Sequence, residues 1–571
     1  MRIFTGKPAS PGIAIGPVFL FKSQIATLKT YTIEDPAAEY TRLEVALKKI
    51  KADLSLLVEK LQTEGLMEEA EIFEAHIAIS EDPELLEATK ALIEEKKINA
   101  ETALTEAAST FIEMLNALED EYLAARAADI SDVVRKINIE LSGDTSTSAV
   151  LTRPSIVVAE DLMPSDTASF PREYVLGLCI ELGSNTSHAA ILAKAMGIPA
   201  VIQAPKVAHE IENGTMMILD GKKGEVIAAP TAAYLASYRE ELEKRKKLEE
   251  ILLERSSLPV QTKDGHAVQI AANLGNASDA HKAAAMHAQG VGLMRTEFLY
   301  LDKPDLPDET QQAATYSEIM DIMGQEYPLV FRTLDVGGDK PLQAVPQAAE
   351  LNPFLGVRGL RLCLLHDEVL FKPQVRALLK AGSARNLFVM FPMVTSILEV
   401  RSAKKLFHQY MDELVLEGIA PPAHLEVGIM IEVPGAAVMA DKLATEVDFF
   451  SIGTNDLTQY TQAADRNQTT LSYISDGLEP AVLRLIAKVA EAANENGKWA
   501  GICGELGGDP MAIPILLGLG LHELSMNPNA IPDAKEIVRN WSMEKAREVA
   551  LKALDMESAE QVRDMMKAYV D

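Results

Sequence analysis

The chain of 571 residues has few cysteines, few aromatic residues and no long apolar run. Its three cysteines, Cys179, Cys363 and Cys503, lie far apart and form no CxxC pair. This spacing argues against a disulfide framework and against a zinc site. No stretch of about eighteen apolar residues occurs, and the N-terminus lacks the apolar core of a signal peptide. We therefore expect no membrane span and a cytoplasmic location.

Positive charge is also scarce, with 54 Lys and Arg against 84 Asp and Glu, which makes the formal net charge −30. A phosphate backbone would be repelled by such a surface, so we do not expect nucleic-acid binding. The same acidic surface would favour a basic protein partner.

The length indicates roughly three or four domains. Residues 1–20 read as Gly/Pro-punctuated strands, and residues 146–230 return to short strands, ending in a hairpin over 216–227. The simplest topology joins these two segments into one β/α domain. Residues 21–145 read as an inserted all-α domain, with one long amphipathic stretch followed by three more helices. Residues 231–258 read as a charged linker helix.

Residues 259–571 repeat one unit eight times, an apolar run followed by a helical pattern. The runs are 268–271, 290–294, 329–331, 388–391, 427–431, 449–452, 499–502 and 523–526. Eight such units predict a TIM (β/α)8 barrel. The expected fold class is therefore multidomain α/β, with an inserted helical domain, a linker helix and a C-terminal barrel.

Polar residues follow seven of the eight predicted strands, where a barrel carries its chemistry. They are Asn273, Arg295, Arg332, Glu432, Asn455 with Asp456, Cys503 and Asn527. Short helices often start with capping residues, which is the alternative reading of this pattern. Three arginines at or just past strand ends, Arg295, Arg332 and Arg466, suggest a small substrate with a phosphate and a carboxylate. A lone arginine is more often part of a surface ion pair.

Glu432 and Asp456 supply hard oxygen ligands on neighbouring strands, which suits Mg²⁺ or Mn²⁺. Alternatively, either carboxylate caps a helix or pairs with an arginine. Cys503 stands among charged groups and could exchange a proton, whereas Cys179 and Cys363 read as buried packing.

His188 follows Thr186 and Ser187, which can cap a short helix that Gly197 can end. A helix N-terminus stabilises a phosphoryl group, and a nucleophilic histidine there can accept one and pass it on. The alternative is a partly buried histidine with local hydrogen bonds.

Several motifs together resemble the Enzyme I family of the bacterial sugar phosphotransferase system, the phosphoenolpyruvate–protein phosphotransferases. The resemblance runs essentially end to end, and its most specific segments are 186–188, 295–299, 352–356, 428–434, 451–460 and 503–505. It implies that phosphoenolpyruvate phosphorylates His188, which passes the group to the small carrier protein HPr. It also implies a cytoplasmic homodimer that associates through the C-terminal barrel.

The resemblance assigns further roles residue by residue. Substrate binding falls to Arg295, Arg332, Arg358, Arg466, Lys340 and Asn455. Mg²⁺ falls to Glu432 and Asp456, and protonation of the enolate to Cys503. Thr167 and Lys194 would lie near the phosphohistidine, and Lys194 stands where the family commonly has Arg. HPr would dock on the helical insert, where the matching segment carries Tyr122, Arg126, Asp129 and Asp132.

Two other interpretations stay open at this stage. A pyruvate phosphate dikinase or phosphoenolpyruvate synthase shares the histidine domain and the barrel, but it needs a nucleotide-binding domain. This chain has a helical insert instead and no GxxxxGK loop. A non-catalytic phosphocarrier scaffold would not need the intact polar set at the strand ends.

Overall fold

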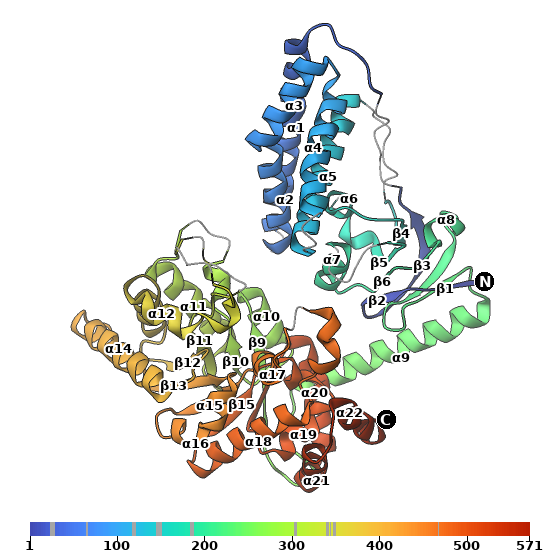
Figure 1. Cartoon of the computed structure of the whole chain (residues 1–571). Helices are drawn as coiled ribbons and strands as arrows, with labels where there is room; N and C mark the ends of the chain where they lie inside the picture. Colours follow the sequence, from blue (N-terminus) through green and yellow to red (C-terminus); the bar gives the residue numbers. More distant parts are fainter. Residues whose placement is uncertain are drawn as a thin grey trace. The chain divides into compact units, whose positions relative to one another are not determined.

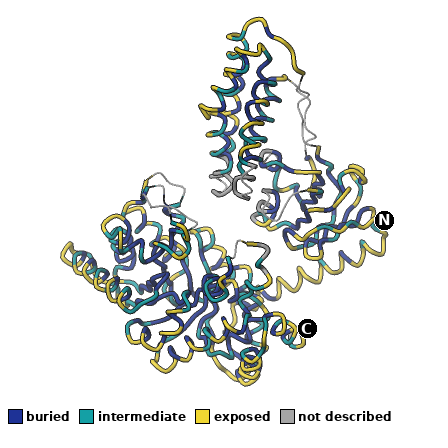
Figure 2. The backbone as a smooth tube through the Cα atoms, viewed as in Figure 1, coloured by how far each residue is buried: buried dark blue, intermediate teal, exposed yellow. Residues whose placement is uncertain are grey.

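A computed structural model shows the architecture of the chain (Figure 1). The structure describes all residues except 23–28, 64–66, 117–120, 144–150, 169, 183–187, 302–304, 339–341, 343, 346–349, 466–467 and 571. The chain divides into two compact units, Met1–Lys246 and Lys247–Asp571. Each unit has its own buried core (Figure 2). The multidomain α/β class predicted from the sequence is confirmed, whereas the four domain boundaries stay a prediction.

The first unit contains an eight-stranded sheet in the order β1-β8-β7-β3-β4-β5-β6-β2. Its strands are β1 (Arg2–Thr5), β2 (Lys7–Ser10), β3 (Ile13–Leu20), β4 (Ser155–Ala159), β5 (Val175–Ile180), β6 (Ala200–Ile202), β7 (Met216–Asp220) and β8 (Glu225–Ala228). Strand β3 pairs in parallel with β4 and antiparallel with β7. The N-terminal strands therefore complete a sheet whose other strands come more than 130 residues later, as the simplest topology predicted.

Short helices accompany this sheet, namely α6 (Pro164–Ala168), α7 (His188–Met196) and α8 (Val207–Glu210). The two faces of the sheet bury separate apolar clusters. One cluster includes Val157 of the sheet with Ala189 and Ala193 of α7, and the other includes Val158 with Val207 of α8. Burial on both faces explains why β4 is a continuous apolar run rather than an alternating one.

The helical insert contains five helices within the described residues. They are α1 (Pro36–Thr63), α2 (Met67–Ser80), α3 (Pro83–Lys96), α4 (Ala100–Asn116) and α5 (Glu121–Ser142). The expectation of three helices after the first amphipathic stretch is wrong, because four follow it. Connections of only two or three residues on either side of α3 leave almost no loop signature in the sequence. Asp82 starts α3 by accepting a hydrogen bond from Leu85 N, and Lys97 ends it at φ 52°.

A single helix, α9 (Ala232–Ser256), follows the first sheet. Its C-terminal carbonyls are bonded by α20 (Ile531–Asn540): Lys535 Nζ donates to Ser256 O at 2.7 Å, and Arg539 Nη2 donates to Arg255 O at 2.9 Å. Cations at a helix C-terminus satisfy carbonyls that have no partner within the helix. This end of α9 is therefore fixed to the barrel.

The second unit is a closed barrel of eight parallel strands in the order β10-β11-β12-β13-β14-β15-β16-β9. Its strands are β9 (Gln269–Leu274), β10 (Val291–Met294), β11 (Leu329–Arg332), β12 (Asn386–Phe391), β13 (His424–Ile431), β14 (Phe449–Ile452), β15 (Trp499–Ile502) and β16 (Glu523–Met526). Every predicted apolar run overlaps one of these strands, so the predicted TIM barrel is confirmed.

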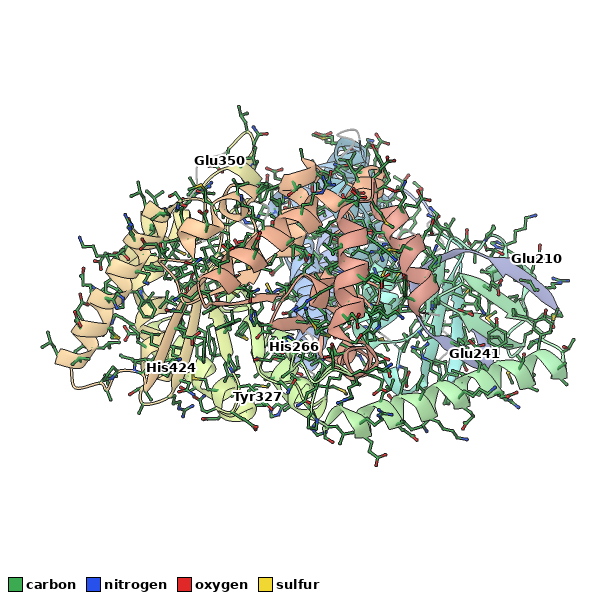
Figure 3. All side chains as sticks on the ribbon, turned by 90° about the horizontal axis from the view of Figure 1, so that it is seen from below. Glu210, Glu241, His266, Tyr327, Glu350 and His424 are labelled. Atoms are coloured by element: carbon green, nitrogen blue, oxygen red, sulfur yellow. The ribbon has the colours of Figure 1, made fainter. Side chains whose placement is uncertain are left out.

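Helices surround the barrel. They are α10 (Ala277–Ala285), α11 (Glu309–Met323), α12 (Leu360–Leu365), α13 (Lys372–Ala381), α14 (Ile397–Leu416), α15 (Pro434–Val438), α16 (Ala440–Leu443), α17 (Thr454–Gln462), α18 (Pro480–Glu495), α19 (Ala512–Gly518), α20, α21 (Met543–Leu554) and α22 (Ala559–Val570). Figure 3 labels Glu350, in the connection after β11, at the upper edge of the view, and Tyr327 and His424, which precede or begin strands, in its lower part.

Glu523 is a buried carboxyl inside the barrel, with an exposed fraction of 2%. Glycines make room for it, because a Cβ added at Gly292 would lie 2.4 Å from Glu523 Oε1, and one at Gly501 would lie 2.8 Å from it. Gln269 Nε2 donates to Glu523 Oε2 at 3.1 Å. Burial raises the pKa of Glu523 to about 8, so the carboxyl keeps its proton at neutral pH.

This raised pKa predicts a pH-dependent stability. Between the unfolded pKa of about 4.3 and the folded value, the native state holds a proton that the unfolded chain has lost. The free energy of unfolding therefore falls as pH rises from 5 to 8, by an amount on the order of a few kcal/mol. Glu523→Gln removes this contribution. Urea titrations of the barrel transition at pH 5 and pH 8 should show a smaller pH dependence in the variant. The control is Glu548→Gln, at an exposed position on α21. The same change in the free energy of unfolding between pH 5 and pH 8 in all three proteins would contradict the prediction.

Candidate active site

A cavity of about 870 Å³ opens at the carboxyl ends of the barrel strands. Seven of the residues predicted to bind substrate or metal or to transfer protons line it: Arg295, Arg332, Arg358, Glu432, Asn455, Asp456 and Cys503. Barrel closure explains this convergence, because the carboxyl ends of all parallel strands meet on one face. The structure thus gathers in one place side chains that are up to 208 positions apart in the sequence (503 − 295).

Arg332, the last residue of β11, is buried between two carboxylates. Its Nη2 donates to Glu297 Oε1 at 3.0 Å, and its Nη1 lies 3.0 Å from Asp335 Oδ2. Its Nε is buried and has no hydrogen-bond partner among the described residues. The flanking carboxylates raise the pKa of Arg332 against the opposing effect of burial. The guanidinium is therefore charged, held in one orientation and left with an unsatisfied donor.

Arg358 shares Asp335 with Arg332. Its Nε and Nη2 donate to the two oxygens of Asp335 at 3.1 and 3.2 Å, and its Nη1 donates to Asp456 Oδ1 at 2.9 Å. The loop that carries Asp335 runs close beneath this arginine, because a Cβ at Gly337 (φ +105°) would lie only 2.6 Å from Val357 O. Asp335 therefore bridges two arginines at the beginning and the end of the connection between β11 and α12.

Glu432 is 1% exposed, and its Oε1 accepts a hydrogen bond from Met393 N at 2.6 Å. Burial, with the nearby charges of Asp335 and Asp456, raises the pKa of Glu432 to about 8, against the opposing effect of Arg332 and Arg358. A divalent cation would offset this surplus of negative charge, so Glu432 and Asp456 fit an oxygen-binding metal. Within the described ranges, no group of three or more His, Cys, Asp or Glu is arranged to hold a metal, so such an ion would need other oxygen ligands as well. Asp456 also pairs with Arg358, which was the alternative reading of this residue.

Cys503 follows β15 and is 3% exposed. Burial raises the pKa of its thiol to about 11, although the hydroxyl of Ser451 and the charge of Arg332 act in the opposite direction. The sulfur therefore carries a proton at neutral pH and can donate it. The other two cysteines are fully buried and lie among apolar residues, as the sequence indicated.

Further residues predicted to bind substrate or to follow a strand are Lys340, Arg466, Arg295, Asn455 and Asn527. Lys340 and Arg466 lie outside the described residues. Arg295 is exposed at the cavity. Asn455 Oδ1 accepts from Glu505 N at 3.3 Å and so holds the turn after Cys503. Asn527 is a capping residue and does not line the cavity: its Oδ1 accepts from Asn529 N at 3.0 Å, as the capping alternative proposed.

Two acidic residues of the cavity, Glu297 and Asp335, were missed by the sequence reasoning. Each follows a predicted arginine by two or three positions. An acidic residue at that spacing usually caps a helix, so the pattern alone carries little information. Their burial, at 6% and 7% exposed, is the signal that marks them as functional.

His188 is the first residue of α7, although its side chain and the predicted caps Thr186 and Ser187 lie outside the described part. Helix α6, which carries Thr167, packs against α7. Thr167 is 8% exposed, and its Oγ1 donates to Pro164 O at 2.7 Å. Lys194 is exposed on the last turn of α7.

The helical insert contacts this region through α5. Arg135 Nη2 lies 2.8 Å from Asp132 Oδ1 and 2.9 Å from Asp166 Oδ1, so it ties α5 to the turn that carries Thr167. His76 Nε2 lies 3.4 Å from Asp129 Oδ1, and Arg126 Nη1 lies 3.8 Å from Asp129 Oδ2. The side chain of Tyr122 lies outside the described part.

Among the described helices, none combines the length and apolar character needed to cross a membrane.

Three family models match the chain: the N-terminal domain of PEP-utilising enzymes over 5–126, their mobile domain over 151–224 and their PEP-binding domain over 250–543.

Relatives from several bacteria match almost the whole chain. The phosphoenolpyruvate-protein phosphotransferase of Geobacillus stearothermophilus is 42% identical, covering 98% of this chain and 97% of the relative. That of Bacillus subtilis is 41% identical, covering 99% of both chains. An NMR solution structure of an Enzyme I protein is 34% identical over 43% of this chain and 99% of its own, with a TM-score of 0.38. The chain therefore belongs to the PEP-utilising enzymes and, among them, to the phosphoenolpyruvate–protein phosphotransferases.

Proposed function

We propose that this enzyme transfers the phosphoryl group of phosphoenolpyruvate to its own His188 and then to a histidine of the carrier protein HPr, releasing pyruvate. This would be the first step of sugar uptake by the phosphotransferase system. The observation that carries the proposal is the cavity at the barrel mouth, which combines oriented arginines, paired acids and a protonated thiol.

The arginines would bind the phosphate and the carboxylate of phosphoenolpyruvate. Arg332 and Arg358 are held by carboxylates before any substrate arrives, so little conformational entropy is lost when they bind an anion. Arg295 and Asn455 line the same cavity. By the family motif, we assign the remaining contacts to Lys340 and Arg466.

Glu432 and Asp456 would hold Mg²⁺, with Mn²⁺ as a possible substitute, through their carboxylate oxygens. The ion would supply Lewis-acid neutralisation of charge on the substrate oxygens. Its positive charge would also favour the ionised form of Glu432, whose pKa is raised in the protein alone.

The transfer itself needs placement and charge neutralisation more than covalent help. In the proposed step the His188 imidazole attacks phosphorus and an N–P bond forms. The bond between phosphorus and the enol oxygen breaks, which leaves the enolate of pyruvate. The proton of the Cys503 thiol then passes to carbon 3 of the enolate, which becomes the methyl group of pyruvate. The thiolate that remains regains its proton from water. His188 belongs to the first compact unit and the cavity to the second, so the reaction requires the two units to meet.

The helical insert would dock HPr. Arg126, Asp129 and Asp132 lie on α5, and the chain as a whole is strongly acidic, which would steer a basic partner. Arg135 connects this helix to the Thr167 turn, so a docked carrier would lie close to the α7 region. Thr167 and Lys194 are proposed to surround the phosphohistidine; Lys194 offers a point charge without the planar fork of arginine.

We also propose a homodimer through the barrel. Helix α12 packs against α14, and this region exposes Leu365 (67%) and Leu398 (71%) to solvent. Exposed apolar side chains of this kind mark association surfaces. Sedimentation equilibrium would exclude the dimer if the protein stayed monomeric at micromolar concentration.

The proposed domains are 1–20 with 146–230, 21–145, 231–258 and 259–571. The proposed location is the cytoplasm, where phosphoenolpyruvate is made.

The proposed function is tested with phosphoenolpyruvate labelled in its phosphoryl group. In the presence of Mg²⁺ and without ATP, the protein should acquire a label that acid releases and alkali does not, as expected for phosphohistidine. The label should then move to purified HPr. Absence of label would overturn the proposal. Absence of label together with binding of HPr would favour a non-catalytic scaffold, and a requirement for ATP would favour a dikinase.

A further inference from the structure

Asn273 lies inside the barrel on β9, and its side chain reaches across β16 to the turn that carries Cys503. Its Nδ2 donates to the backbone oxygen of Cys503 at 2.8 Å and lies 3.5 Å from the backbone oxygen of Ser525. Its Oδ1 accepts from Ser525 Oγ at 2.7 Å. Asn273 therefore links three neighbouring strands, β9, β16 and β15, at the level of the proposed proton donor.

The amide has only one orientation that satisfies this set of partners. Two carbonyl oxygens require the NH2 end, because an amide oxygen facing them would be repelled. The hydroxyl of Ser525, which is fully buried, donates to the oxygen end in this orientation and so satisfies the amide oxygen. Both ends of the Asn273 amide are therefore held by buried partners.

Asn455 holds the other end of the same turn. Its Oδ1 accepts from Glu505 N, two residues beyond Cys503, and Cys503 N donates to Ile452 O at 3.0 Å within the strand ladder. The turn is also tight, because a Cβ at Gly504 would lie 1.6 Å from Thr454 Oγ1. The main chain of Cys503 is therefore bonded on both sides, and the carbonyl that leads into the turn is bonded by Asn273.

We propose that Asn273, held at its amide oxygen by Ser525, is a positioning residue that sets the place of the Cys503 thiol and hence the face of the enolate that receives the proton. This inference rests on the proposed function. Asn273 does not line the cavity and touches no proposed substrate position, so it would act only through Cys503. Proton transfer depends steeply on geometry, and a displacement of about 1 Å can reduce a rate about 100-fold.

The proposal separates two half-reactions. Phosphorylation of His188 uses the arginines, whereas enolate protonation uses Cys503. In Asn273→Leu, which fills the same space without a donor, we expect labelling of His188 from phosphoenolpyruvate to stay within about threefold of the parent. Turnover to pyruvate, measured with HPr as acceptor, should fall about 100-fold in kcat with a smaller change in KM. Ser525→Ala should show an intermediate loss of kcat, because Asn273 keeps its bond to the Cys503 carbonyl and loses only the hydroxyl that donates to its Oδ1.

The decisive measurement is stereochemical. Phosphoenolpyruvate with one tritium of known geometry on carbon 3 is converted in deuterated water, and the chirality of the pyruvate methyl group is determined. The parent enzyme should give one chirality, and Asn273→Leu a nearly racemic methyl, because the enolate is then protonated from solvent. Asn494→Leu is the matched control, since Asn494 Nδ2 also donates to backbone oxygens, of Ala490 and Gly520, away from the cavity.

The outcomes are distinguishable. If the parent protein is never labelled, the proposed function fails. If the parent is labelled but Asn273→Leu retains kcat and chirality, the positioning role is overturned while the function stands. If Asn273→Leu does not fold, Ser525→Ala decides: unchanged chirality together with unchanged kcat overturns the proposal.

Discussion

Replacing His188 by alanine is expected to abolish phosphorylation of the protein by labelled phosphoenolpyruvate. His188 begins α7, where free backbone N–H groups favour a phosphoryl group, and alanine offers no nucleophile. Without the N–P bond no phosphoryl group can reach HPr, so pyruvate release coupled to HPr should fall to the background of the assay. The measurement is the amount of acid-labile label per protein after incubation with Mg²⁺.

His209→Ala is the matched control for this loss. His209 belongs to the same unit, its side chain is 63% exposed, and it pairs only weakly at the surface with Glu181 at 3.1 Å. Labelling of this variant should equal that of the parent. Label retained in His188→Ala would show that another residue receives the phosphoryl group, and the proposed route would then be wrong.

The second large effect is expected for Arg332→Met. The substitution removes a guanidinium that contacts Glu297 and Asp335 and leaves those buried carboxylates without a counter-charge. The same guanidinium is proposed to bind the substrate anion at the cavity. Because an arginine that neutralises a transferring phosphoryl group is worth about 10³-fold or more, kcat/KM for His188 labelling should fall by about 10³-fold. The free energy of unfolding of the barrel should fall by roughly 3–5 kcal/mol.

Arg376→Met separates catalysis from stability. Arg376 on α13 is also tied by ion pairs, to Glu309 at 2.9 Å and Glu417 at 2.8 Å, but it does not line the cavity. Its variant should lose some stability and keep its labelling rate. Arg332→Lys should recover part of the stability and little of the rate, since a lysine keeps the charge without the fork. Equal labelling rates for Arg332→Met and the parent would remove Arg332 from the substrate site.

The barrel was predictable because each of its strands is a short apolar run buried on both sides. Such a run is visible without any knowledge of its neighbours, and all eight predicted runs overlap strands. The helical insert was less predictable. The connections on either side of α3 are only two or three residues long, and the amphipathic pattern does not reveal turns that short. The predicted number of helices was therefore wrong.

The predicted site residues were found by their position after strands and by family motifs, which gave seven side chains on one cavity. Asn527 shows the limit of the positional argument, since a polar residue after a strand can equally be a cap. Glu297 and Asp335 show the opposite error. Neither was singled out from the sequence, and only their burial against Arg332 reveals that they orient it.

The sequence by itself determined the strand–helix alternation, the polar residues at the strand ends and the family, because these depend on local periodicity and on contiguous motifs. The tertiary structure alone decided which of those polar groups meet. Asp335 bridges Arg332 and Arg358 because the connection between β11 and α12 folds back on itself. Asn273 reaches Cys503 from 230 positions away because the barrel closes between β9 and β16. Charge, burial and hydrogen bonding at such distances follow from the approach of strands in space, which no local pattern encodes.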